Sequence, residues 1–200
     1  MESLDIYMSK VAQALARSVP DKAEGLYTDL AAAETFTQEK PGADAGTPPD
    51  NLVSFQEIMM VEIANCNLDK IQLGINELLK HFLKTISRDR EQYMAEQYLY
   101  RLRMIFKRCL LPDFPFAEEI WNYICACLRS TGSHLLEQEY YAAVREIIDS
   151  LSGMGRIAAL HGLPTANTQS SLRILENKAL EKNEKQLASV AKNARFNLET

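Results

Sequence analysis

Metal-binding residue types occur in this chain, but their spacing does not suit a metal site. Cys125 and Cys127 are two positions apart, so on a helix their thiols point about 200° apart and cannot reach one ion from one face. Glu77 and His81 share a helical face, yet a di-iron bundle requires two Glu-x-x-His pairs and two further glutamates. The sequence therefore predicts neither a bound metal nor another cofactor.

Residues for nucleophilic catalysis are also lacking. The chain has no Gly-x-Ser-x-Gly motif and no glycine-rich phosphate loop. Its histidines have simpler explanations: His81 lies beside Lys80 and Lys84 on a face expected to be solvated, while His134 and His161 fall near predicted helix ends. We therefore predict no catalytic residue, and a small-molecule enzyme with an unrecognised pocket is kept as a lesser alternative.

The clearest chemical signal is a concentration of positive charge. Residues 80–108 contain eight basic and three acidic residues, a net charge of +5 in a chain whose formal total is −5. A surface of this kind suits an acidic partner. The candidate partner-binding residues are Lys80, Lys84, Arg88, Arg101, Arg103, Lys107 and Arg108.

The basic residues allow three interpretations. They can form a solvated face or pair with the acidic N-terminal residues of the same chain, they can bind an acidic or amphipathic protein segment, or they can bind nucleic acid. Phosphate contacts and stacking on nearby tyrosines would serve nucleic acid, and these tyrosines are Tyr93, Tyr98 and Tyr100. The sequence pI of about 5.3 argues against a dedicated nucleic-acid-binding domain, for which the pI is usually above about 9.

The composition is that of an ordinary globular protein. The 200 residues are 46% apolar and 24% charged, which excludes disorder for most of the chain. The longest uncharged apolar run, 120–128, is too short to span a membrane. The first residues lack the basic start of a signal peptide, and the four cysteines do not resemble a disulfide framework. We therefore expect a cytoplasmic protein without membrane insertion.

Apolar residues recur with helical periodicity almost throughout. We predict an N-terminal helical hairpin over 1–36, a flexible linker over 37–51 with three prolines and two glycines, and a main helical domain over 52–200. Gly132 and Ser133 are expected to separate two helices of that domain. Its predicted helices cover 52–65, 68–87, 91–110, 116–130, 134–150 and, at the end, 184–197.

The C-terminal third suggests a weak internal repeat. The pattern that begins at Ser150-Leu151 recurs 21 residues later at Ser171-Leu172. Gly162 and Asn183 occupy the same offset in the two copies, where each is expected to end a helix in a left-handed turn. The pattern predicts a repeat-like end to the domain, in which the polar last helix serves as a cap.

The segment MGRIAALHGL, with the long polar helix after it, resembles helical-hairpin repeats of the HEAT type over residues 140–198. The resemblance implies scaffolding and protein binding. The expected fold is all-α, with antiparallel hairpins stacked as a short HEAT-like superhelix or an irregular bundle. The expected function is a non-enzymatic interaction or adaptor module that uses the basic hairpin 68–108, and a homo-oligomer is possible.

Overall fold

The structure is a computed structural model that describes residues 6, 9–11, 13 and 55–198. The predicted N-terminal hairpin (1–36) and linker (37–51) lie outside the described residues, apart from the five helical positions before residue 14. The chain separates into two compact units, Met1–Ile58 and Met59–Thr200. The second unit carries all the basic residues of the predicted site.

The part of the chain described from residue 55 onward is helical and contains no strand. It has seven α-helices and one short 3-10 helix: α3 (Phe55–Ala64), α4 (Leu68–Thr85), η2 (Arg88–Arg90), α5 (Glu91–Cys109), α6 (Ala117–Glu137), α7 (Tyr141–Leu160), α8 (Ala166–Glu181) and α9 (Lys185–Phe196). The predicted all-α fold is confirmed. The HEAT-like superhelix stays a prediction.

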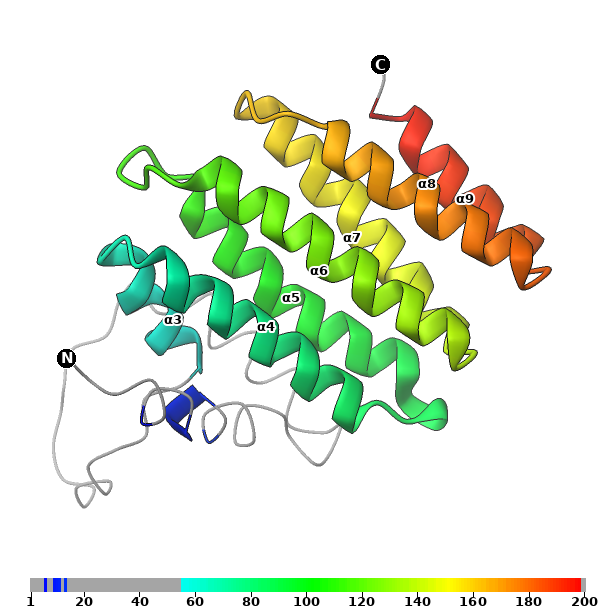
Figure 1. Ribbon diagram of the computed structural model, residues 1–200, viewed down its shortest axis with the longest axis horizontal. Helices are drawn as coiled ribbons and strands as arrows, with labels where there is room; N and C mark the ends of the chain where they lie inside the picture. Colours follow the sequence, from blue (N-terminus) through cyan, green and yellow to red (C-terminus); the bar gives the residue numbers. More distant parts are fainter. Residues whose placement is uncertain (1–5, 7–8, 12, 14–54, 199–200) are drawn as a thin grey trace, which may run out of the picture. The chain divides into compact units, whose positions relative to one another are not determined.

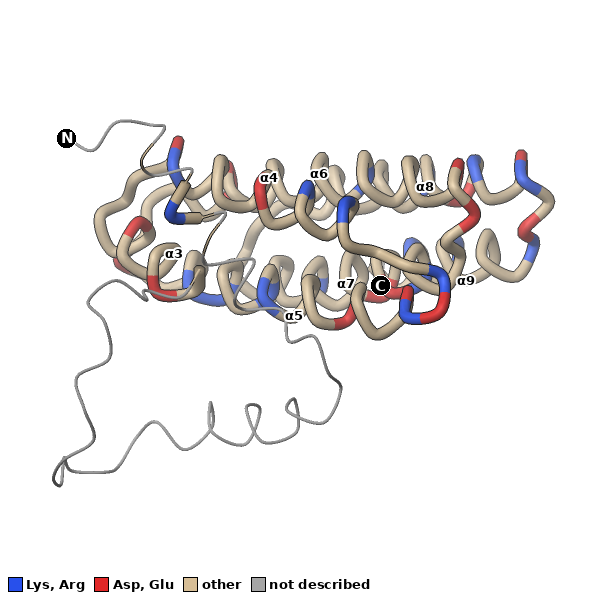
Figure 2. Tube along the Cα trace, turned by 90° about the horizontal axis from the view of Figure 1, so that it is seen from below, with Lys and Arg blue, Asp and Glu red and all other residues tan. Residues whose placement is uncertain are grey.

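From α4 onward the helices alternate between two layers. Helices α4, α6 and α8 form one layer and α5, α7 and α9 form the other, as Figures 1 and 2 show. Each helix packs on its neighbours in its own layer and on helices of the facing layer. Short turns join successive helices, so the chain builds the hairpins α4–α5, α6–α7 and α8–α9 side by side.

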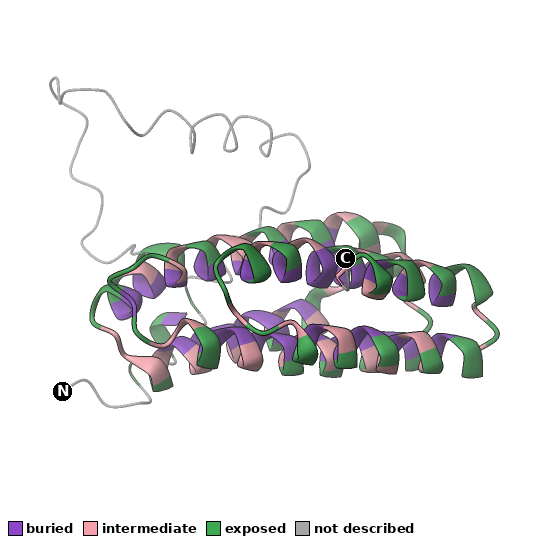
Figure 3. Ribbon diagram, turned by 90° about the horizontal axis from the view of Figure 1, so that it is seen from above, coloured by how far each residue is buried: buried purple, intermediate pink, exposed green. Residues whose placement is uncertain are grey.

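Apolar side chains fill the space between the layers, where Figure 3 shows the buried parts of the helices. The stripe of α4 is typical, with Ile71, Ile75, Leu78 and Phe82 buried. Burial of each such side chain stabilises the fold by about 1.5–3 kcal/mol. The chain's only tryptophan, Trp121, is fully buried, so its fluorescence reports on the integrity of this interior.

The predicted bounds of two helices, 116–130 and 134–150, are wrong, because the structure has α6 over Ala117–Glu137 and α7 over Tyr141–Leu160. Gly132 and Ser133 do not separate two helices, because α6 continues through them to Glu137. Gly132 is buried, and a Cβ atom there would lie 3.0 Å from Cδ2 of Leu175 on α8. The glycine therefore allows close packing of α6 against α8. The actual turn follows at Glu139, whose φ is 63°.

The two helix ends predicted from the repeat are confirmed. Gly162, with φ of 75°, follows α7, and Asn183, with φ of 62°, follows α8. Glycine adopts this left-handed conformation freely, and asparagine tolerates it better than most residues do. Both residues reverse the chain so that the next helix packs in the opposite layer.

Two glycines of α7 give a direct test of the packing against α8. A Cβ atom at Gly155 would lie 2.9 Å from Cγ2 of Thr168, which is fully buried, whereas one at Gly153 would meet nothing within 4 Å. We expect Gly155→Ala to lower the free energy of unfolding by about 1–2 kcal/mol, since the overpacking exceeds the gain in helix propensity. Gly153→Ala should raise it by up to about 1 kcal/mol.

Urea unfolding followed by Trp121 fluorescence measures both variants. Equal stability of the two alanine variants would contradict the close approach of α7 and α8 at Gly155.

Candidate interaction surface

The two-layer packing separates the seven candidate basic residues. Lys80 and Lys84 lie on α4, and Arg88 lies in η2 just beyond it. The other four lie on α5, in the facing layer: Arg101, Arg103, Lys107 and Arg108. Facing layers bury their inner sides, so the solvent-exposed sides of α4 and α5 point in opposite directions (Figure 2). The structure therefore does not bring all seven residues onto one continuous surface.

Three of the seven form ion pairs within the second unit. The pairs are Lys80–Glu77 at 2.9 Å, Arg88–Glu139 at 3.4 Å and Arg108–Asp113 at 3.3 Å. Exposed pairs of this kind contribute about 0–1 kcal/mol each. The three carboxylates lie outside residues 80–108, so acidic residues from neighbouring turns compensate part of the positive charge.

Two arginines of α5 are partly committed to their own helix. The Arg101 guanidinium donates to the Gln97 carbonyl at 3.0 Å, and burial lowers its pKa from the ordinary value. Arg103 donates to the Leu99 carbonyl at 3.4 Å and lies near Glu146 of α7, whose carboxylate it helps to stabilise. Arg103 therefore belongs to the interface of α5 with α7, away from α4.

Lys84 and Lys107 differ from the three paired residues. Both are exposed, and no residue in the described ranges forms an ion pair with either lysine. They lie on different layers, so one flat partner surface cannot contact both. This difference makes them useful as a matched pair for mutation.

A groove lies between α4 and α6, on the outer side of their layer. Its volume is about 290 Å³, and its lining residues are Asn76, Leu79, Lys80, Leu83, Cys127, Ser130, Thr131 and His134. Leu79, Leu83 and Cys127 supply apolar surface, while Lys80 and His134 stand on opposite helices. Lys84 follows Lys80 by one turn of α4, on the same side of the helix.

The sequence pattern did not reveal the α6 half of this groove. Ser130, Thr131 and His134 carry no motif, and only the fold shows that α6 is the neighbour of α4 in its layer. The i, i+4 spacing of Ser130 and His134 places both on one face of α6, but nothing in the sequence says which helix that face meets.

The four cysteines are free thiols in different environments. Cys127 lines the α4–α6 groove; burial raises the pKa of its thiol, and a hydrogen bond with Tyr123 acts in the opposite direction. Burial raises the pKa of Cys109 and of Cys125 to about 12, while Cys66 is half-buried. Thiol labelling can therefore distinguish the groove from the interior.

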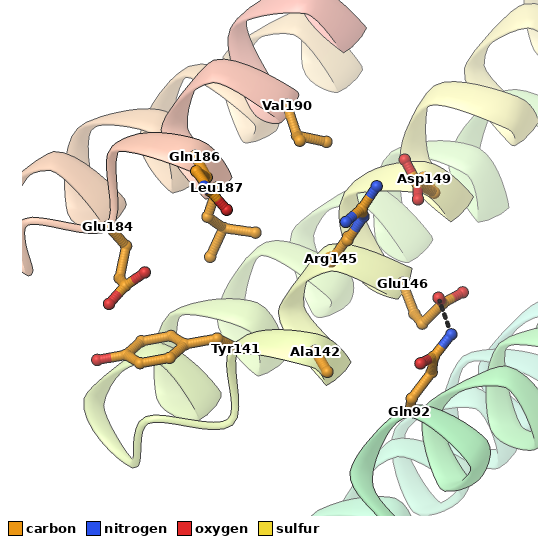
Figure 4. A pocket seen from close by; sticks show the side chains of 10 residues that line it. All are labelled: Gln92, Tyr141, Ala142, Arg145, Glu146, Asp149, Glu184, Gln186, Leu187 and Val190. Carbon is orange, nitrogen blue, oxygen red and sulfur yellow. Dashed lines mark hydrogen bonds between the residues drawn. The ribbon is translucent and has the colours of Figure 1, made fainter.

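A second groove, with a volume of about 440 Å³, lies between α5, α7 and α9 (Figure 4). Its charged lining residues are Arg145 and three carboxylates, those of Glu146, Asp149 and Glu184. Gln92 donates a hydrogen bond to Glu146 at 3.3 Å. None of the seven candidate basic residues lines this groove, and its carboxylates outnumber its one arginine.

The three tyrosines near the basic residues do not form a stacking platform. Tyr98 has no exposed surface and bonds to α4, while Tyr100 is 37% exposed. A base can stack only on an accessible ring. The buried Tyr98 removes one of the three residues on which the nucleic-acid interpretation relied.

Within the described residues, no three His, Cys, Asp or Glu side chains are grouped so that they could hold a metal ion. The helices described there include none that combines the length and apolar character needed to cross a membrane. No protein-family model matches the chain, and no curated protein or solved structure matches it at a significant level.

Glu146 supplies a test of the acidic groove. Burial, Glu96 and Asp149 raise the pKa of its carboxyl from the ordinary value of 4.5. Because its pKa is higher in the folded protein than in the unfolded chain, the Glu146 carboxyl group contributes to folding stability below pH 4.5. This contribution is lost as the pH rises through the folded-state pKa. Glu146→Gln should therefore raise the free energy of unfolding at neutral pH, by about 0.2–1 kcal/mol for a partly exposed group.

Thermal unfolding of the wild type and of Glu146→Gln measures this effect. The gap between their midpoints should shrink in acid and in about 1 M salt, where like-charge repulsion is screened. A destabilised variant at neutral pH would show that Glu146 is well compensated in the groove.

Proposed function

We propose that this protein is a non-enzymatic protein-interaction module that binds an acidic, amphipathic segment of a partner protein in the groove between α4 and α6. One observation carries the proposal: apolar surface from Leu79, Leu83 and Cys127 lies beside the positive charge of Lys80, and Lys84 follows one turn later. An amphipathic helix with acidic flanks has the complementary pattern.

The two parts of the groove have different physical roles. Removal of apolar surface from water supplies affinity at about 25 cal/mol per Å², although much of that is offset by the entropy lost on binding. The lysines favour acidic over basic segments and speed the encounter. Lys80 and Lys84 are about 6 Å apart along the α4 axis, so carboxylates one helical turn apart on the partner can meet both.

The remaining five candidate residues have lesser roles in this proposal. Arg88 is paired with Glu139, and Lys80 is likewise paired. Unlike Lys80, Arg88 does not line the groove and only extends the line of charge beyond α4. The α5 residues lie in the other layer and act as solvated or internally paired side chains. The proposed binding site is thus no longer the whole basic hairpin 68–108. It is the outer side of α4 together with the neighbouring side of α6.

Selection from displayed peptides tests the preference for acidic segments. Two libraries of helical peptides with the same randomised apolar face are presented to the full chain, one flanked by glutamates and the other by lysines. We expect only the glutamate-flanked library to yield binders. Equal enrichment of both libraries, or of neither, would reject the proposal, and so would preferential capture of RNA or duplex DNA at low salt.

Charge reversal locates the site of a selected peptide. The double substitution Lys80→Glu and Lys84→Glu should weaken binding by about tenfold or more, because it replaces attraction by repulsion at both contacts. The matched control, Lys107→Glu with Arg108→Glu, also reverses one lysine without an ion pair among the described residues and one cation in an exposed ion pair. It makes the same change in net charge on the other layer and should leave affinity within about twofold. Isothermal titration calorimetry gives both affinities, and thermal unfolding confirms that both variants are folded.

The Cys127 thiol provides an independent readout of occupancy. A bound segment should slow alkylation of Cys127 and leave alkylation of Cys66 unchanged, since Cys127 alone of the two lines the groove. Mass spectrometry of the labelled peptides measures both rates. Unprotected Cys127 in a saturated complex would place the binding site elsewhere.

A further inference from the structure

A polar contact joins α4 to α5 inside the second unit. Tyr98 of α5 is fully buried, and its hydroxyl contacts Nδ1 of His81 and Oγ1 of Thr85, the latter at 3.2 Å. His81 and Thr85 are one turn apart on α4, so a single hydroxyl bridges both. The Phe82 ring packs against the Tyr98 ring with centroids 5.2 Å apart, while His81 is half-buried and Thr85 exposed, so the contact lies at the edge of the apolar interior.

The number of protons determines the direction of these hydrogen bonds. Thr85 Oγ1 lies 2.9 Å from the carbonyl oxygen of His81 and donates its only proton there. Oγ1 can then accept from the Tyr98 hydroxyl, and we assign Nδ1–H of His81 as the donor to Tyr98, because every group in the contact then has a partner. The hydroxyls of Tyr98 and Thr85 each donate one hydrogen bond and accept one. The arrangement leaves Nε2 as the ring nitrogen that can take up a proton.

The surroundings of His81 oppose its positive charge. On its own helix Lys84 lies one turn ahead, and Glu77 lies one turn behind but is already paired with Lys80. On α5 it contacts Tyr98, and the Arg101 guanidinium is close enough to Tyr98 to lower the pKa of that hydroxyl, against the effect of burial. Burial and Lys84 lower the pKa of His81 below its ordinary value of 6.5, in agreement with this geometry.

We propose that His81 is a proton sensor that controls the stability of the α4–α5 hairpin. In the neutral state its Nδ1–H completes the hydrogen-bonded chain through Tyr98 and Thr85 and holds the two helices together. Uptake of a solvent proton at Nε2 places a half-buried cation beside Lys84 and loosens the hairpin. The inference does not depend on what the α4–α6 groove binds.

The sign of the pH effect follows from the lowered pKa. The unfolded chain takes up a proton at this position more readily than the folded protein does, so stability is full above pH 6.5 and is lost as the pH falls toward the folded pKa. Because α4 also carries Lys80 and Lys84, acid should loosen the helix on which the groove is built.

Hydrogen exchange of the full chain tests the proposal at about pH 7.5 and about pH 5.5, after correction for intrinsic exchange rates. In the wild type, the amides of α4 and α5 should open several-fold more often in acid, while those of α8 and α9 change less. His81→Gln can still bond to Tyr98 but cannot titrate, so its acid effect should disappear. His161→Gln, which changes an exposed histidine after α7, should behave like the wild type.

A second variant keeps the test independent of the His81 substitution. Lys84→Gln removes a neighbouring cation, so the NMR titration midpoint of His81 should move up toward 6.5 and the acid effect should become smaller. The proposal is overturned if the wild type shows no acid effect on α4 and α5, if His81→Gln retains it, or if Lys84→Gln leaves the titration of His81 unchanged.

Discussion

Burial of apolar side chains between two layers of helices determines where the polar side chains of the second unit can lie. Each helix from α4 to α9 turns its apolar stripe toward the facing layer, so its charged residues occupy the opposite side or the helix ends. The constraint is strong because each large apolar side chain contributes about 1.5–3 kcal/mol, whereas an exposed ion pair contributes about 0–1 kcal/mol. Charge is thus distributed by the packing, and as a result a lysine lines one outer groove while carboxylates predominate in the other.

Local periodicity was sufficient to predict most helices of the described range. The predicted helices at 68–87, 91–110 and 184–197 agree with α4, α5 and α9 to within two residues, since each has a clear apolar stripe. Gly132 was misinterpreted because its role depends on Leu175, a residue on another helix that is distant in sequence. A glycine that ends a helix and a glycine that allows a neighbouring helix to pack closely look the same in the local sequence. Only the tertiary contact distinguishes them.

The candidate site was predictable only in part, for the same reason. Counting charges along residues 80–108 identified the basic residues, but a hairpin whose helices lie in different layers cannot present them together. The partners of Lys80 across the groove come from α6, more than forty positions later, and no motif marks Ser130 or His134. The sequence pattern likewise could not predict that Tyr98 is fully buried, because it showed only a tyrosine near arginines.

We propose that the groove between α4 and α6, rather than the whole basic hairpin, receives an acidic partner. Amide chemical-shift mapping of the full chain with a selected glutamate-flanked peptide tests it most directly. We expect the largest shifts on the groove-facing sides of α4 and α6, around Leu83 and Cys127, and small shifts around Lys107. Shifts concentrated on α5 and α7, with α6 unaffected, would contradict it.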